Sequence, residues 1–368
     1  MISSIHIRGY RGFMDFEMSG LERVNLLVGT NNSGKTSVLE AIYLLASRGD
    51  PLALWGVLWR RGERLAGVDR NERSPELDVS HLFNGHDAHV GSKFALSAKN
   101  DTPERQVTFS IGEIKIDQST ANAARERAGV QVPSGLGLHI KGNPVPPVPV
   151  IPLSRSGGLY SDVLTPRRLR RKTAEDEGEI AAQFITAESL DGSELISLWD
   201  KVALTPNESR VLSALKFLDC DIDRIAAQAG GQNYAGRGGF IVKLKGLEHP
   251  IPIGSMGDGM WRMLAMAIAI AHCKGGVLLI DEIDTGLHYS VLTNMWRLIF
   301  GAARELDVQV FATTHSSDCI KSLAELCYAE TDVADSVTLQ RIEKDKPKSV
   351  PYTADEIGVA AEKQIEVR

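Results

Sequence analysis

The hydrophobic and polar positions of the first fifty residues predict three strands, a glycine-rich loop and a helix, in that order. Residues 5–7 and 13–16 alternate between apolar and polar side chains, as strands with one buried face do. The run 24–28 (VNLLV) is apolar without a helical period, which is typical of a strand buried on both faces. A glycine-rich segment follows, and the apolar positions of 38–46 then recur at helical spacing.

Later in the chain, short apolar runs alternate with amphipathic helical patterns. The pattern predicts strands at 94–96, 107–116, 277–280, 308–313 and 337–342 and a hairpin over 221–245. It predicts helices at 206–217, 260–272, 289–306 and 355–363, and one more helix that ends near residue 326. This alternation favours an α/β fold in which helices cover a mainly parallel sheet.

The middle of the chain has two biased segments. Residues 133–152 contain six prolines, which favours an extended surface linker over a recognition segment for another protein. Residues 166–227 predict helices, because Thr165 and a following proline form a helix-start signal. A basic run at 167–172 precedes an acidic run at 175–179; the pair is either a solvated face or a patch that contacts phosphate.

Composition narrows the class of protein. Hydrophobic residues make up 43% and charged residues 24% of the 368 positions, which excludes a disordered chain or a disulfide scaffold. No apolar run is long enough for a membrane span, and no signal-peptide core precedes the first strand, so we expect a cytoplasmic protein without membrane contact. Four widely spaced cysteines suggest reduced thiols. The net charge of −6 excludes a uniformly basic surface but leaves room for a local basic patch.

The glycine-rich segment after the third strand fits a phosphate-binding motif. Residues 29–36 match GxxxxGK[ST] between a strand and a helix. Backbone amides of such a loop, with the helix N-terminus, hold polyphosphate oxygens. We expect Lys35 to reach the β- and γ-phosphates of ATP and the Thr36 hydroxyl to ligate Mg²⁺. The other expected nucleotide-binding residues of this segment are Gly29, Asn31, Asn32, Ser33, Gly34 and Ser37.

Two acidic residues follow the apolar run 277–280. Ligands of open parallel sheets bind at the carboxyl ends of the strands, so Asp281 is the expected magnesium ligand. Glu282 is the expected base that orients and polarises the attacking water. His315 follows the next strand; a lone histidine is usually structural, but this position favours contact with a γ-phosphate. The 246 positions between Lys35 and Asp281 require a long excursion of the chain.

A second glycine-rich turn precedes the helix at 260–272. Its small residues and the Ser255 hydroxyl lie at the positive end of that helix, which is either a second anion site or only a turn. If the two phosphate-binding surfaces are remote in one protomer, each could face the nucleotide of a second chain.

Together these motifs resemble the ABC-type ATPase head of SMC, RecF and OLD-family proteins (OLD stands for overcoming lysogenization defect). The resemblance covers residues 1–50 and 240–330 well. Residues 255–262 (SMGDGMWR) resemble the family's signature segment, in the S-x-G-x-G-x-x-R form of the OLD-like branch. It implies a P-loop NTPase with an ABC-ATPase-like head, a β-rich N-terminal lobe and a short helical insertion. We expect an N-terminal lobe over 1–165, the insertion over 166–230 and a C-terminal lobe over 231–368.

The resemblance also implies a role for individual residues. The family holds two ATP molecules between two heads, so Ser255, Gly257 and Gly259 of one chain would serve the ATP of the other. Asp284 resembles the loop that contacts the partner protomer, and Arg11 the short N-terminal loop beside the nucleotide. His315 takes the switch-histidine position.

The sequence departs from the family pattern in several ways. Asp258 stands where transporter-type signatures have glycine, and a carboxylate would repel a triphosphate, so it must point away or the contact across the dimer differs. The glutamine loop has only weak candidates, Gln106 and Gln118. Long heptad arms are missing, and some 40 residues after the last core strand are too few for a TOPRIM nuclease, so any nuclease or toxin would be a separate chain.

The leading functional hypothesis is an ATPase whose ATP-driven homodimer controls DNA or an effector protein in genome maintenance or anti-phage defence. DNA and a separately encoded effector, such as a TOPRIM nuclease, are the candidate partners. The alternative is a nucleotide-dependent scaffold with little turnover that restrains a separate nuclease or toxin. A transporter subunit is disfavoured by the signature and by the long excursion of the chain.

Overall fold

The structure is a computed structural model that describes residues 1–65, 76–100, 105–114, 135–143, 150–154, 156–160, 181–188, 190–228 and 239–363. The charged runs at 167–179, Gln118 and the tip of the hairpin predicted at 221–245 lie outside the described residues.

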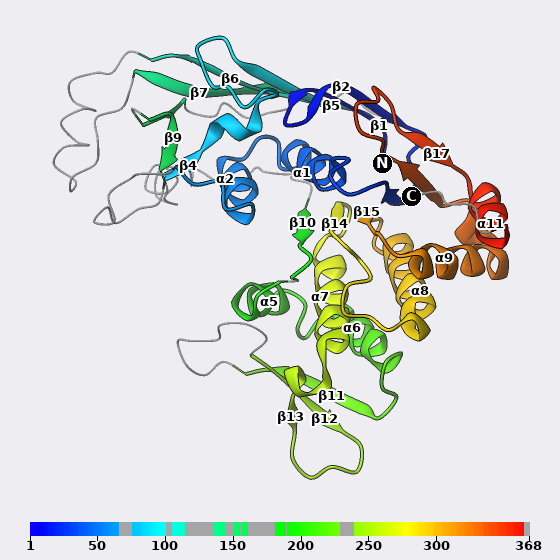
Figure 1. Ribbon diagram of the computed structural model, residues 1–368. Coiled ribbons are helices and arrows are strands. Elements are labelled where there is room, and N and C mark those ends of the chain that lie inside the picture. Colours follow the sequence, from blue (N-terminus) through cyan, green and yellow to red (C-terminus); the bar gives the residue numbers. More distant parts are fainter. Residues whose placement is uncertain are drawn as a thin grey trace.

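The N-terminal part of the chain forms a six-stranded antiparallel sheet. Its order is β2-β1-β5-β6-β7-β8, and it arches over helix α1 in Figure 1. The strands are β1 (Ile2–Tyr10), β2 (Phe13–Ser19), β5 (Lys93–Asn100), β6 (Arg105–Glu113), β7 (Leu136–Asn143) and β8 (Ile151–Pro152).

A second six-stranded sheet, which we call the core sheet, brings together strands from distant parts of the chain. Its order is β10-β14-β15-β3-β16-β17, and only the pairing of β16 with β17 is antiparallel. The strands are β3 (Val24–Val28), β10 (Ala182–Ile185), β14 (Val277–Ile280), β15 (Gln309–Thr313), β16 (Val337–Arg341) and β17 (Val350–Tyr352). The prediction of an α/β fold with a mainly parallel sheet is confirmed.

Helices cover both faces of the core sheet, because its central strands are apolar on both faces. In β14, Leu279 packs in the core shared with α1 (Lys35–Ala46), whereas Leu278 and Ile280 pack in the core of the opposite helical layer. That layer contains α7 (Asp258–His272), α8 (Tyr289–Glu305) and α9 (Ser317–Ala329). Helix α1 therefore lies between the two sheets (Figure 1).

Smaller elements surround this frame. The strands β11 (Ile222–Ala227), β12 (Phe240–Leu244) and β13 (Ile251–Pro252) form a small sheet, so the predicted hairpin is confirmed. The remaining elements are α2 (Pro51–Arg60), β4 (Glu76–Asp78), η1 (Val79–Leu82), β9 (Gly158–Tyr160), α5 (Gly192–Trp199), α6 (Pro206–Lys216), η3 (Ile253–Met256), α10 (Thr331–Ala334) and α11 (Ala354–Glu362).

Two predictions for the middle of the chain were wrong where the structure describes it. The proline-rich stretch is not a linker over 136–143, because β7 pairs along its whole length with β6; the prolines flank this strand rather than interrupt it. The stretch 166–227 is not wholly helical, because β10 joins the edge of the core sheet beside β14.

No helix within the described residues is long and apolar enough to cross a membrane. Each of the four cysteines is a free thiol, and three of them are buried.

Candidate active site

The phosphate loop connects β3 to α1 at the carboxyl edge of the core sheet. Its conformation depends on two glycines with positive φ: 146° at Gly29 and 100° at Gly34. A Cβ atom at Gly29 would lie 2.2 Å from the carbonyl oxygen of Ile342, and one at Gly34 would lie 2.5 Å from the Phe13 ring. Only glycine fits at these positions. No side chain caps α1, so the amides of its first turn remain available to an anion.

Lys35 is the first residue of α1 and is buried under the loop. Its ammonium donates hydrogen bonds to the carbonyl oxygens of Gly29 at 2.8 Å and of Thr30 at 2.9 Å. Burial lowers the pKa of Lys35, while the carboxylates of Asp281 and Glu282 oppose that shift. The ammonium is thus held beside the loop and within the field of both acidic residues.

Thr36 and Asp281 meet at the carboxyl edge of the core sheet. The Thr36 hydroxyl donates to the two carboxylate oxygens of Asp281, at 3.3 and 3.1 Å. The hydroxyl of Thr313, at the end of β15, donates to the same carboxylate at 2.6 Å. A hydroxyl and a carboxylate in contact are the oxygen ligands that Mg²⁺ prefers.

Glu282 has an unusual backbone conformation, with φ at 47°. Its amide donates to the Thr313 hydroxyl at 2.8 Å, and its carboxylate accepts from the Thr285 hydroxyl at 3.2 Å. A left-handed conformation costs a non-glycine residue roughly 1–3 kcal/mol and is often found at functional sites.

The end of β15 places His315 near the same cluster. Burial, with the positive charge of Lys35, lowers the pKa of the His315 imidazole, although nearby carboxylates oppose this. The neutral ring therefore predominates at neutral pH. The preceding Thr314 hydroxyl donates to the Asp284 carboxylate at 2.5 Å, which ties the loop after β14 to the loop after β15.

The predicted signature segment lies at the start of α7. Gly257 has φ at 97° and ψ at 170°, and it is exposed, as is Ser255. The other side of the turn packs closely against its own chain, because a Cβ at Gly259 would lie 3.1 Å from the carbonyl oxygen of Gly286.

Arg262, one turn farther along α7, bonds the backbone of the acidic pair. Its guanidinium donates to the carbonyl oxygens of Asp281 at 2.7 Å and of Glu282 at 2.9 Å. Arg262 ends the predicted signature motif, but nothing in that motif indicates this contact.

Arg11, which the family resemblance places beside the nucleotide, is held by carboxylates of its own chain. Its side chain is 5% exposed and ion-paired to Glu40 at 2.8 Å and to Glu63 at 2.5 Å. In this arrangement both carboxylates hold the guanidinium, so a contact with nucleotide stays a prediction that requires Arg11 to exchange partners. Ser37 is similarly engaged, because its hydroxyl accepts from Arg61 at 3.1 Å. Asn31 and Asn32 are exposed on the loop.

The glutamine loop is still not assigned. Gln106 lies on β6, which belongs to the antiparallel sheet and not to the core sheet. The strand that borders β14 on its outer side is β10, and the backbone of Thr186 after it contacts Arg262.

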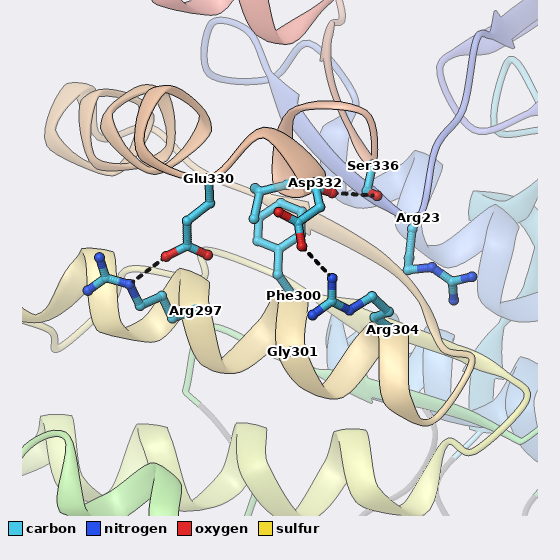
Figure 2. A pocket seen from close by; sticks show the side chains of 9 residues that line it. Arg23, Arg297, Phe300, Gly301, Arg304, Glu330, Asp332 and Ser336 are labelled. Carbon is cyan, nitrogen blue, oxygen red and sulfur yellow. Dashed lines mark hydrogen bonds and ion pairs between the residues drawn. The ribbon is translucent and has the colours of Figure 1, made fainter.

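A separate pocket lies at the opposite edge of the core sheet and is not part of this site (Figure 2). It is lined by residues that precede β3 and β16 and by residues of α8, among them three arginines. Arg297 pairs with Glu330 at 3.0 Å, Arg304 with Asp332 at 2.6 Å and Arg23 with Asp307 at 3.0 Å. Carboxylates therefore balance its positive charge.

The site fits a magnesium-bound triphosphate. The buried Ser33 hydroxyl has no hydrogen-bond partner among the described residues, and buried polar groups rarely stay unpaired without a functional reason. With the uncapped helix and the Thr36–Asp281 pair, this supplies anion donors and hard oxygen ligands at one place.

Comparisons with known proteins agree with this geometry. Two protein families match: "AAA ATPase domain" over residues 1–128, and "AAA domain, putative AbiEii toxin, Type IV TA system" over residues 167–318. An ATP/GTP phosphatase of Helicobacter pylori is 22% identical over 370 residues, which cover 96% of this chain and 95% of the relative. The DNA replication and repair protein RecF of Bacillus cytotoxicus is 44% identical over 45 residues, 12% of each chain.

Among solved structures, an SMC head bound to the C-terminal winged-helix domain of ScpA is 14% identical with a TM-score of 0.49, over 96% of this chain and 97% of that one. An SMC head with an extended coiled coil, bound to the C-terminal domain of ScpA from Pyrococcus furiosus, is 12% identical with a TM-score of 0.48, over 99% of each chain. From the two ATPase-domain matches and the assembled phosphate loop with its acidic pair, the protein is an ATPase with a P-loop NTPase fold.

Proposed function

We propose that two copies of this ATPase close around two ATP molecules and that this closure controls DNA or an effector protein. One observation carries the proposal: each protomer has a built phosphate site and, apart from it, an exposed signature turn. Ser255 and Gly257 face solvent, and a Cβ at Gly257 would meet no atom within 4 Å. An exposed glycine turn at a helix N-terminus suits the phosphates of a second chain's nucleotide.

Within one protomer, the loop amides and Lys35 hold the β- and γ-phosphates. Thr36 and Asp281 would hold magnesium, which when bound neutralises charge that develops on the phosphates. The Glu282 carboxylate orients the attacking water and accepts its proton. A neutral His315 donates a hydrogen bond toward the γ-phosphate and so reports its presence.

Across the dimer, Ser255, Gly257 and Gly259 of one chain contact the ATP of the other. Asp258 is compatible with this role because it packs beside its own chain's Gly286, whose added Cβ would lie 3.3 Å from the Asp258 Cβ. Asp284, which Thr314 holds in place, faces the partner's loop. The contact to ATP then uses the Ser255 hydroxyl and backbone amides rather than the Asp258 carboxylate.

The controlled partner is a cytoplasmic one, either DNA or a separately encoded effector. RecF, which matches a short part of the chain, carries a name for DNA replication and repair, and one matching family carries a name for a toxin of a toxin–antitoxin system. A scaffold with little turnover that restrains a nuclease is the second candidate. Steady-state ATP hydrolysis measured with and without DNA separates these two functions, because the scaffold would hydrolyse ATP slowly in both conditions.

The dimer is tested with a variant that binds ATP but does not hydrolyse it. Glu282→Gln should accumulate as a dimer when ATP and magnesium are added, as measured by light scattering, and should release little phosphate. Glu325→Gln, an exposed substitution on α9, is the control and should behave as the wild type. A Glu282→Gln protein that stays monomeric at saturating ATP would contradict the closed dimer.

A further inference from the structure

The guanidinium of Arg262 connects the signature helix to the backbone of the acidic pair. It is 2% exposed and donates to three carbonyl oxygens: those of Thr186, Asp281 and Glu282. These carbonyls lie at the carboxyl ends of the paired strands β10 and β14. A single side chain of α7 thus joins two strand ends and both residues of the acidic pair.

The guanidinium of Arg262 stays charged although it is buried, where a charge is unfavourable. Burial lowers its pKa to about 10, although Asp281, Asp284, Glu282 and Glu188 oppose that shift, so the side chain stays positive at neutral pH. Its three hydrogen bonds within the described residues all go to backbone carbonyls, and its Nε has no hydrogen-bond partner among those residues. A buried donor without a partner is destabilising, and an apolar side chain of similar length would avoid this cost.

The backbone of Glu282 has a strained conformation that the hydrogen bond from Arg262 helps to maintain. Its φ of 47° is unfavourable for a non-glycine residue, and three bonds oppose its relaxation. The amide donates to Thr313, while the carbonyl accepts from Arg262 and from the Thr285 amide. Because Arg262 bonds only backbone carbonyls here, it occupies no carboxylate oxygen of the acidic pair.

The signature turn leads directly into the helix that carries Arg262, because Gly257 is the N-cap of α7. Residues 260–271 of α7 are all buried, and Gly259 packs closely against Gly286, because an added Cβ at Gly259 would lie 3.1 Å from the Gly286 carbonyl oxygen. A displacement at the start of α7 is therefore passed to the guanidinium and to the strand ends that it holds.

We propose that Arg262 is a positioning residue that couples the signature turn to the Glu282 backbone of the same chain. Engagement of the signature by the partner's ATP fixes α7, and Arg262 then holds Glu282 in the orientation that activates water. The coupling rests on the proposed dimer, whereas the bracing of Glu282 within one chain does not.

The test separates ATP binding from hydrolysis in Arg262→Met, Arg262→Lys and the exposed control Arg304→Met. We expect Arg262→Met to keep its Kd for ATP within about threefold of the wild type while kcat falls about 10-fold to 100-fold. Arg262→Lys should restore part of kcat, and Arg304→Met should change neither value. Wild-type kcat in a folded Arg262→Met protein would overturn the proposal. If Arg262→Met does not fold, Arg262→Lys decides: a lower kcat at unchanged Kd supports the proposal, and an unchanged kcat overturns it.

A double variant tests the coupling to the signature. Gly257→Ala combined with Arg262→Lys should lower kcat by less than the product of the two single effects, because both act on one helix. A fully multiplicative effect would overturn the coupling. If the proposed dimer is wrong, the Glu282→Gln protein stays monomeric. The comparison of kcat between the Arg262 variants then still tests whether Arg262 positions Glu282 within one chain.

Discussion

The hydroxyl of Thr36 lies 3.1 Å from one carboxylate oxygen of Asp281, although 245 positions separate the two residues. Two distant segments therefore reach the same edge of the core sheet. The contact follows from strand order: β3 and β14 flank β15, so the loops that follow all three strands converge.

Removal of the Lys35 ammonium should abolish ATP binding. The ammonium is the cation held against the loop by Gly29 and Thr30, and its loss leaves the phosphate charge uncompensated. Calorimetry should detect no ATP binding by Lys35→Ala at concentrations that saturate the wild type. Lys321→Ala, an exposed substitution on α9, should bind as the wild type does. Wild-type affinity in Lys35→Ala would refute the assignment of the loop.

Arg11 should matter for stability whether or not it contacts nucleotide. Its ion pair with Glu40 is buried and its pair with Glu63 is partly buried, and removal of one partner of a buried pair costs about 3–5 kcal/mol. Arg11→Met should lower the free energy of unfolding in urea by about 3 kcal/mol. Arg8→Met, which removes an exposed arginine paired with Asp15, should change it little. If both variants are equally stable, the buried network contributes nothing.

Much of the fold could be predicted because its signals are local. The run VNLLV, the glycine-rich loop and the amphipathic helix after it lie within one stretch of sequence, and each has a period of its own. The strand β10 could not be found in this way, because it has four residues in a helix-like region and forms only by pairing with β14. The prolines around β7 led to the wrong prediction of a linker, because proline is excluded from the interior of a strand but not from its flanks.

The site was predictable as far as its motifs extend. Lys35, Thr36 and Asp281 come together at the strand ends where their motifs place them, and Glu282 and His315 lie beside them. The role of Arg262 could not be predicted, because its acceptors are backbone carbonyls of two remote strand ends. The ion pair of Arg11 with Glu63 could not be predicted either, because Glu63 lies 52 positions away in the chain and belongs to no recognisable motif.

The signature turn requires glycine at position 257. Its φ of 97° and ψ of 170° fall in a region that is essentially reserved for glycine. Gly257→Ala should therefore distort the surface that receives the partner's ATP, so that dimer formation and kcat fall while the Kd of the protomer for ATP is unchanged. Light scattering and phosphate release measure the two effects. Normal dimerisation of this variant would argue against a role of the turn across the interface.

Stability should decrease in mild acid, in part because of His272. Burial and the charge of Lys201 lower the pKa of this imidazole below the ordinary histidine value of 6.5. Below that value the unfolded chain binds more protons than the folded one, so stability present above it is lost as the pH falls through the folded pKa. The free energy of unfolding of His272→Gln should depend less on pH than that of the wild type. Identical pH profiles would show that His272 contributes nothing.

Thr36 and Asp281 are expected to share one magnesium ion, and a double-mutant cycle on magnesium-dependent ATP affinity tests this directly. Calorimetry of the wild type, Thr36→Val, Asp281→Asn and the double variant should show that magnesium tightens ATP binding only in the wild type. The double variant should then be no weaker than the weaker single variant. If magnesium tightens ATP binding equally in all four proteins, the two residues do not hold a common metal ion and the proposed site is wrong.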